Sequence, residues 1–157
     1  MNALLTTGAP VTTYPPDQVI SIAIPQARIL TQRGIDDCPP VGFRAARQLR
    51  PVDRDPACVQ IGAFGPPEAP VGLGIDGRVV CFSPWSDAGC RVVNTSLSAF
   101  VDSLDAFTRF GPFSADPDIA EVTARHLRPI LAHLDPAALA DADGVWPTLL
   151  DKVAAGR

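Results

Sequence analysis

The residues able to do chemistry in this sequence are few and widely spaced. Its four cysteines, Cys38, Cys58, Cys81 and Cys90, are separated by 20, 23 and 9 residues. No two of them have the gap of roughly two to four residues that structural zinc sites use. Because the first 25 residues show no secretory signal, we expect buried free thiols and no disulfides.

The two histidines are His126 and His133, a spacing that places both on one face of an unbroken helix. A metal site needs further ligands, and the nearest acid in the sequence is Glu121. We therefore expect one packed and one exposed histidine. The paired acids Asp36 and Asp37 are possible metal ligands, but adjacent exposed aspartates in a loop are more often solvated. The sequence predicts no metal and no other cofactor.

Nucleophilic and phosphate-binding motifs are also missing. The sequence contains no Gly-x-Ser-x-Gly elbow. Residues 72–77, Gly-Leu-Gly-Ile-Asp-Gly, look like a phosphate loop, but no helix is predicted after them and no lysine is near. These glycines are better explained as strand and turn residues. We expect no catalytic site, and an enzyme is the least supported class.

Charge is distributed unevenly along the 157 residues, which carry a net charge of −4. Residues 28–54 contain six arginines and three aspartates, whereas residues 55–157 have a net charge of −6. Five acids and one arginine lie between positions 102 and 121. The overall sign argues against nucleic acid as the main partner, and the apolar runs are too short to span a membrane. The acids are either a solvated surface or a face that steers a basic protein partner.

One loop offers an aromatic anchor beside such acids. Trp85 and Asp87 lie in a turn between two expected strands, where a tryptophan either caps the core or forms an interface hot spot. Trp146, at the start of the last helix, is expected to dock that helix onto the sheet. The candidate partner-binding residues are Trp85, Asp87, Asp102, Asp105, Asp116 and Asp118.

Residues 59–93 predict an antiparallel meander, because short apolar runs alternate with turn residues. Asp76-Gly77 predicts a two-residue type I′ hairpin turn, which needs positive φ at both residues. A meander can leave one face open to solvent. The expected strands are Val59–Phe64, Val71–Ile75, Arg78–Phe82 and Cys90–Val93.

Helices are expected on both sides of this meander. Apolar residues recur at three-and-four spacing over residues 96–110, after the capping candidates Asn94-Thr95-Ser96. Before the meander, Gln18–Ile24 predicts a strand and residues 36–56 a polar connection. Pro129 should kink or split the helix that contains it. The expected helices occupy residues 25–33, 96–110, 116–134, 136–142 and 146–155.

The sequence thus predicts one α+β domain over residues 1–157, a twisted antiparallel sheet packed by N- and C-terminal helices. Its strand-to-helix junction, Asn94-Thr95-Ser96-Leu97-Ser98-Ala99-Phe100, resembles the Asn-x-Ser-Leu-x-x-Phe stretch of the SUKH immunity-protein superfamily, in particular its fourth subfamily. Residues 25–35 and 135–139 and the Trp146-x-x-Leu149-Leu150 stretch are similar to other helices of that subfamily. One departure is Gly34-Ile35-Asp36, where the subfamily tends to have Gly-Leu-Pro.

The resemblance implies a SUKH-like fold and a cytoplasmic antidote, not an enzyme, that binds a cognate polymorphic toxin. The toxins of such systems are often nucleases or nucleic-acid deaminases, so a basic toxin would suit this acidic chain. Occlusion of the toxin's active site or substrate groove is the expected mechanism. Two other classes stay open: a general interaction or regulatory scaffold, and a small-ligand-binding domain that uses the concave sheet and the arginines between 44 and 54.

Overall fold

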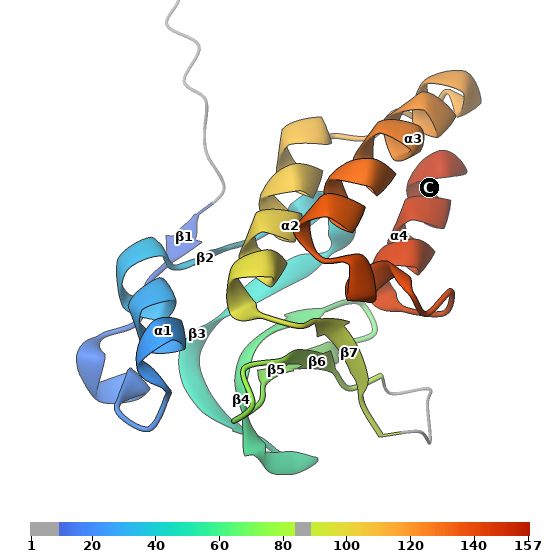
Figure 1. Ribbon diagram of the computed structural model, residues 1–157. Helices are drawn as coiled ribbons and strands as arrows, with labels where there is room; N and C mark the ends of the chain where they lie inside the picture. Colours follow the sequence, from blue (N-terminus) through green and yellow to red (C-terminus); the bar gives the residue numbers. More distant parts are fainter. Residues whose placement is uncertain (1–9, 84–88) are drawn as a thin grey trace, which may run out of the picture.

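A five-stranded antiparallel sheet lies at the centre of the computed structural model, which describes residues 10–83 and 89–157 (Figure 1). Each strand pairs with the next along the chain, so the strand order is β3-β4-β5-β6-β7 and the predicted meander is confirmed. The strands are β3 (Phe43–Val52), β4 (Asp55–Phe64), β5 (Ala69–Leu73), β6 (Val79–Cys81) and β7 (Arg91–Asn94).

Strand β3 corrects the prediction of a polar connection over residues 36–56. Its pairing with β4 is interrupted, because Ala45 pairs with Gly62 and the next paired residue, Arg50, faces Gln60. Four residues of β3 therefore bulge opposite a single residue of β4. The bulge breaks the alternation of side chains that would have indicated a strand. Pro51, which an edge strand tolerates, also argued against one.

The hairpin between β5 and β6 was predicted correctly in place but not in turn type. Positive φ occurs only at Gly77 (φ 83°), not at Asp76. The Gly77 N–H donates to the Gly74 carbonyl (3.0 Å), and the Asp76 carboxylate accepts the Arg78 N–H (3.1 Å). The loop is thus a three-residue one with a left-handed glycine last, not a type I′ turn.

The N-terminal segment packs beside β3 as short helical turns. The predicted strand over Gln18–Ile24 is wrong: Pro16–Val19 is a 3₁₀ turn and α1 (Ile24–Arg28) begins at Ile24, leading into a π turn, Ile29–Arg33. Ile20 and Ile24 are 87% and 71% exposed, so their alternation marks no buried face. Gly34 ends the π turn with φ 77°. The next two residues form β2 (Ile35–Asp36), which pairs with β1 (Val11–Thr12) in a small second sheet.

Three helices lie together on one face of the sheet: α2 (Leu97–Phe110), α3 (Pro117–Leu134) and α4 (Val145–Ala154) (Figure 1). The Ser96 hydroxyl caps α2 by accepting the Ala99 N–H (3.1 Å), as the sequence predicted. Pro129 is exposed within α3 and does not split that helix. The short helix predicted over residues 136–142 is a 3₁₀ turn, Pro136–Leu139.

An aromatic cluster fills the space between sheet and helices. Trp146, Phe43, Phe100 and Phe107 are fully buried, and the Trp146 ring stacks on Phe107 at 5.3 Å between centroids. Phe43 brings β3 into the same cluster through Phe100. Trp146 therefore docks the last helix, as predicted, and burial of these rings is a main source of the fold's stability.

Among the described residues, the thiols and histidines do not gather into a metal site. Cys38, Cys58 and Cys81 are buried free thiols, as predicted, whereas Cys90 is exposed. His126 and His133 are both exposed, which corrects the expectation that one of them packs. Among residues 10–83 and 89–157, no group of three metal-ligating side chains gathers. No helix of that part of the chain is long and apolar enough to cross a bilayer.

Candidate partner-binding surface

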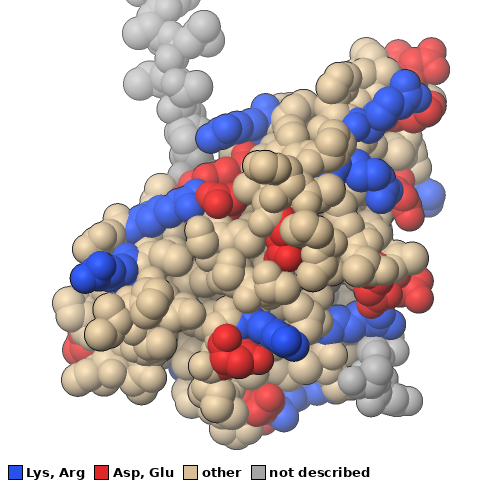
Figure 2. All heavy atoms as spheres, viewed as in Figure 1, with Lys and Arg blue, Asp and Glu red and all other residues tan. Residues whose placement is uncertain are grey.

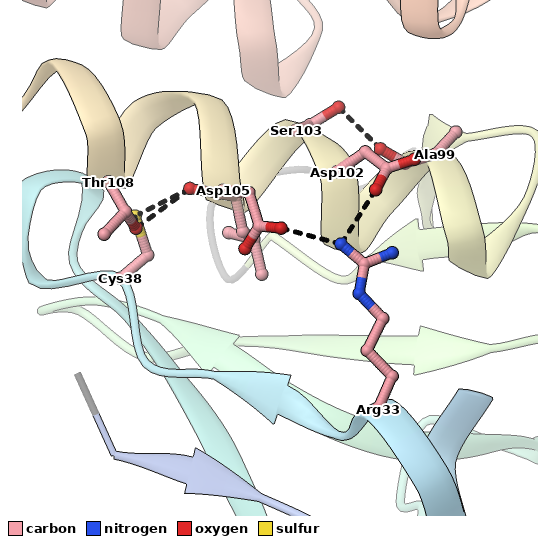
Figure 3. A network of polar contacts seen from close by, with 8 residues as sticks. Arg33, Cys38, Ala99, Asp102, Ser103, Asp105 and Thr108 are labelled. Carbon is pink, nitrogen blue, oxygen red and sulfur yellow. Dashed lines mark hydrogen bonds and ion pairs between the residues drawn. The ribbon is translucent and has the colours of Figure 1, made fainter. Parts of the chain in front are cut away.

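Two of the predicted acids, Asp102 and Asp105, lie together on the exposed side of α2 (Figure 3). Three residues apart on a helix, they share one face. Arg33, from the end of the N-terminal helical segment, reaches between them and forms ion pairs of 2.8 Å to Asp102 and 2.7 Å to Asp105. Their side chains keep 37% and 32% exposure, so both carboxylates still face solvent.

A third carboxylate, Asp36, joins this group from β2. Its pKa is raised above the ordinary value of 3.8, first by partial burial and then by repulsion from Asp105, against the opposing effect of Arg33. Burial lowers the pKa of Arg33, but its hydrogen bonds to Asp102 and Asp105 outweigh this and leave the pKa raised. Arg33 thus pairs with two acids and acts electrostatically on a third, and we call this group, Arg33, Asp36, Asp102 and Asp105, the acidic cluster.

The other predicted acids have a local structural role. Asp116 caps α3, where its carboxylate accepts the Asp118 N–H at 3.0 Å, and Asp118 lies in the positive first turn. Both are exposed. They belong to the start of α3, and no hydrogen bond or ion pair joins them to the acidic cluster among the described residues. Trp85 and Asp87 lie outside the described residues.

The visible charge is mixed and not a single acidic field. Figure 2 shows acidic and basic side chains side by side over this face of the molecule. Near the ends of the segment that contains Trp85, Ser83 and Arg91 line a mostly apolar hollow of about 470 Å³ together with Phe64, Pro66 and Leu149. The hollow thus lies where the sheet residues Phe64 and Arg91 approach Leu149 of α4.

Asn94 of the junction motif is buried and forms a polar network with the C-terminal half. Trp146 Nε1 donates to Asn94 Oδ1 (2.8 Å), and Asn94 Nδ2 donates to Asp135 Oδ2 (3.1 Å). The same Asp135 oxygen accepts the Thr95 N–H at 2.7 Å. Asn94, Asp135 and Trp146 are at most 3% exposed. The network ties the last strand to the turn after α3 and to α4.

A sequence model described as SUKH-4 immunity protein matches residues 2–152. The chain belongs to the SUKH-4 immunity protein family. The comparisons gave no match among the curated proteins and none among the solved structures. The predicted resemblance to this family is thereby confirmed, and the motif residues Asn94 and Trp146 belong to one buried network.

Two residues of the acidic cluster were missed as site residues in this SUKH-4 chain. Arg33 was assigned only to the end of a helix, and Asp36 only to a loop. The partner of Arg33 lies 72 residues away in sequence, at Asp105, so no local pattern pointed to it. The excess of acids between 102 and 121 was the available signal, and Asp105 lies within that stretch.

Proposed function

We propose that this SUKH-4 protein neutralises a cognate protein toxin by binding it, without catalysis, in the cytoplasm of the cell that makes both. The toxin is a basic, nucleic-acid-directed enzyme, a nuclease or a deaminase. The immunity protein covers its active site or substrate groove. Family membership over residues 2–152 is the observation that carries this proposal.

The acidic cluster supports the choice of a basic toxin. Asp102 and Asp105 share the Arg33 guanidinium, and together with Asp36 the cluster has a net charge of −2 when all three carboxylates are ionised. Each carboxylate offers about four acceptor positions, so Arg33 leaves several free for a partner's arginine or lysine. Carboxylates placed this way would substitute for the phosphates of the toxin's substrate.

A complete interface needs more than this cluster. Stable complexes bury about 1,200–2,000 Å² in total and centre on a few aromatic anchors. Trp85 is the proposed anchor, with Asp87 beside it and Asp116 and Asp118 at the rim. Trp85→Ala or Asp87→Arg should weaken protection without unfolding the domain. Unchanged affinity in both variants would remove that loop from the interface.

Co-expression with the toxin-like open reading frame encoded beside this one tests the proposal. Growth rescue and co-purification as a stable complex are expected. A neighbour that is harmless, or that kills regardless, would overturn it. The scaffold alternative then gains weight, and a pull-down from native lysate would test that role.

The cluster is tested separately with the double variant Asp102→Asn, Asp105→Asn. Loss of two charges should slow association and reduce its salt dependence, because complementary charge acts mainly on the encounter rate. Asp151→Asn, an exposed acid on α4, is the matched control and should change neither. Equal association rates for the double variant and the control would exclude the acidic cluster from the interface.

A further inference from the structure

The sheet has a second face, which no helix covers in the described part of the chain (Figure 1). Phe43 and Ile61 point into the core beneath the helices. Because successive side chains of a strand alternate between faces, their neighbours Arg44 and Gln60 point to the opposite side. We call this side the outer face.

Arginines of β3 line a groove of about 410 Å³ on the outer face. Arg44, Arg47 and Arg50 border it together with Gln60, and its carboxylates are Asp37 and Glu68. The positive groove stands out in a chain with a net charge of −4.

Within residues 10–83 and 89–157, the three guanidiniums have no carboxylate partner. Among the residues that the structure describes, none of them forms an ion pair, and Arg50 makes only a hydrogen bond of 3.4 Å to Gln60. Asp37, one of the two acids that line the groove, already accepts the Ala45 N–H at 2.7 Å. The arginines therefore keep their forked donors available for an incoming carboxylate.

Hydrogen bonds fix the backbone that lines the groove. Its central residues form the β3 bulge, and the N-terminal segment fixes that bulge from the other side. The Tyr14 hydroxyl donates to the Ala46 carbonyl at 2.6 Å, and the Leu49 N–H donates to the Gln18 side chain at 3.0 Å. Arg47 therefore belongs to a bulge whose backbone is fixed by hydrogen bonds on both sides of it in the chain.

The spacing of the arginines selects the ligand. Arg44 pairs with Ala63 and Arg50 with Gln60, so the two arginines are set three residues apart along β4, which is about 10 Å. Acidic side chains two to four residues apart on an extended chain match that backbone spacing. A long nucleic acid would be repelled by the net negative charge of the protein.

We propose that the outer-face groove formed by Arg44, Arg47 and Arg50 binds an extended acidic segment of a protein partner. This surface is distinct from the acidic cluster and has the opposite charge. The inference goes beyond the proposed function, since it can be measured with no toxin present.

The probe is a fluorescein-labelled peptide of about twelve residues with glutamate at every third position and glycine or serine between. Fluorescence anisotropy should show salt-sensitive binding, and the glutamine version of the peptide should not bind. Arg44→Ala combined with Arg50→Ala should weaken binding about tenfold or more. The lysine pair Arg44→Lys, Arg50→Lys should bind with intermediate strength, because it keeps charge but loses the fork.

Arg109→Ala is the matched control, since Arg109 is an exposed arginine on α2, on the helix side of the sheet. It should bind the peptide as the unchanged protein does. The inference fails if no variant of the peptide binds, or if the double alanine variant binds as well as the control. It also fails if a single-stranded oligonucleotide of equal charge binds more tightly and is lost in the same variant.

Discussion

Replacement of Asn94 by alanine should remove the centre of the buried network. Asn94→Ala deletes the acceptor of the Trp146 indole N–H and one donor to Asp135. An orphaned buried donor costs about 1–3 kcal/mol, and a lost hydrogen bond to a charged group costs about 1.5–3 kcal/mol. Since both groups lie in the core, we expect the free energy of unfolding to fall by about 3 kcal/mol.

Urea unfolding followed by tryptophan fluorescence measures this change, and thermal unfolding should show a Tm lower by about 6–12 °C. Thr95→Ala is the matched control, because its side chain is exposed and its backbone N–H still reaches Asp135. That variant should stay within about 0.5 kcal/mol of the unchanged protein.

A double-mutant cycle separates the two bonds. Trp146→Phe keeps most of the aromatic packing and removes the indole donor. Combined with Asn94→Ala, it should show a coupling energy of about 1 kcal/mol, because the two groups contact each other directly. An Asn94→Ala protein as stable as the Thr95→Ala control would refute the role given to this network.

Three further predictions concern titration and thiol chemistry. Tyr14 is the only tyrosine, and burial raises its pKa from 10.0 to about 12; tyrosinate absorbance should therefore rise near pH 12, and a midpoint at 10 would contradict this. Because the folded state holds that proton more tightly, stability should be lost between pH 10 and 12, less steeply in Tyr14→Phe. Burial and Asp105 raise the pKa of Asp36 above 3.8, so its ionisation lowers stability as pH rises. Asp36→Asn should raise Tm at neutral pH but not below pH 3.8, and equal shifts at both would exclude this cause. A thiol reagent should modify Cys90 rapidly in the native protein, with Cys38, Cys58 and Cys81 reacting only on unfolding. Cys90→Ser should abolish the rapid phase, and any that survives would show that another thiol is accessible.

Local patterns were enough to predict most elements of the fold. The three-and-four spacing and the Ser96 cap placed α2 within a residue or two of its observed bounds. Alternating apolar runs placed strands β4 to β7. β3 was missed because a four-residue bulge breaks its alternation. The strand predicted over Gln18–Ile24 was wrong because the spacing of Ile20, Ile22 and Ile24 imitates alternation, although Ile20 and Ile24 are exposed.

Local sequence patterns could not predict contacts between residues that lie far apart in the chain. The ion pair between Arg33 and Asp105 spans 72 residues, and the bond between Asn94 and Trp146 spans 52. Composition did locate one partner of the first pair through the excess of acids after residue 102. It also located the arginines of the outer face, although their strand was taken for a connection.

The family motif and the two proposed partner surfaces occupy different parts of the molecule, and this separation has a consequence for variants. Asn94 and Trp146 are buried, so changes there should reduce stability and thereby every binding activity together. Asp102 and Arg44 are on the surface, where an ion pair contributes at most about 1 kcal/mol to folding, so changes there should alter binding alone. The acidic cluster and the outer-face arginines also have opposite charge. Their variants should therefore distinguish a basic partner from an acidic one in a protein that remains folded.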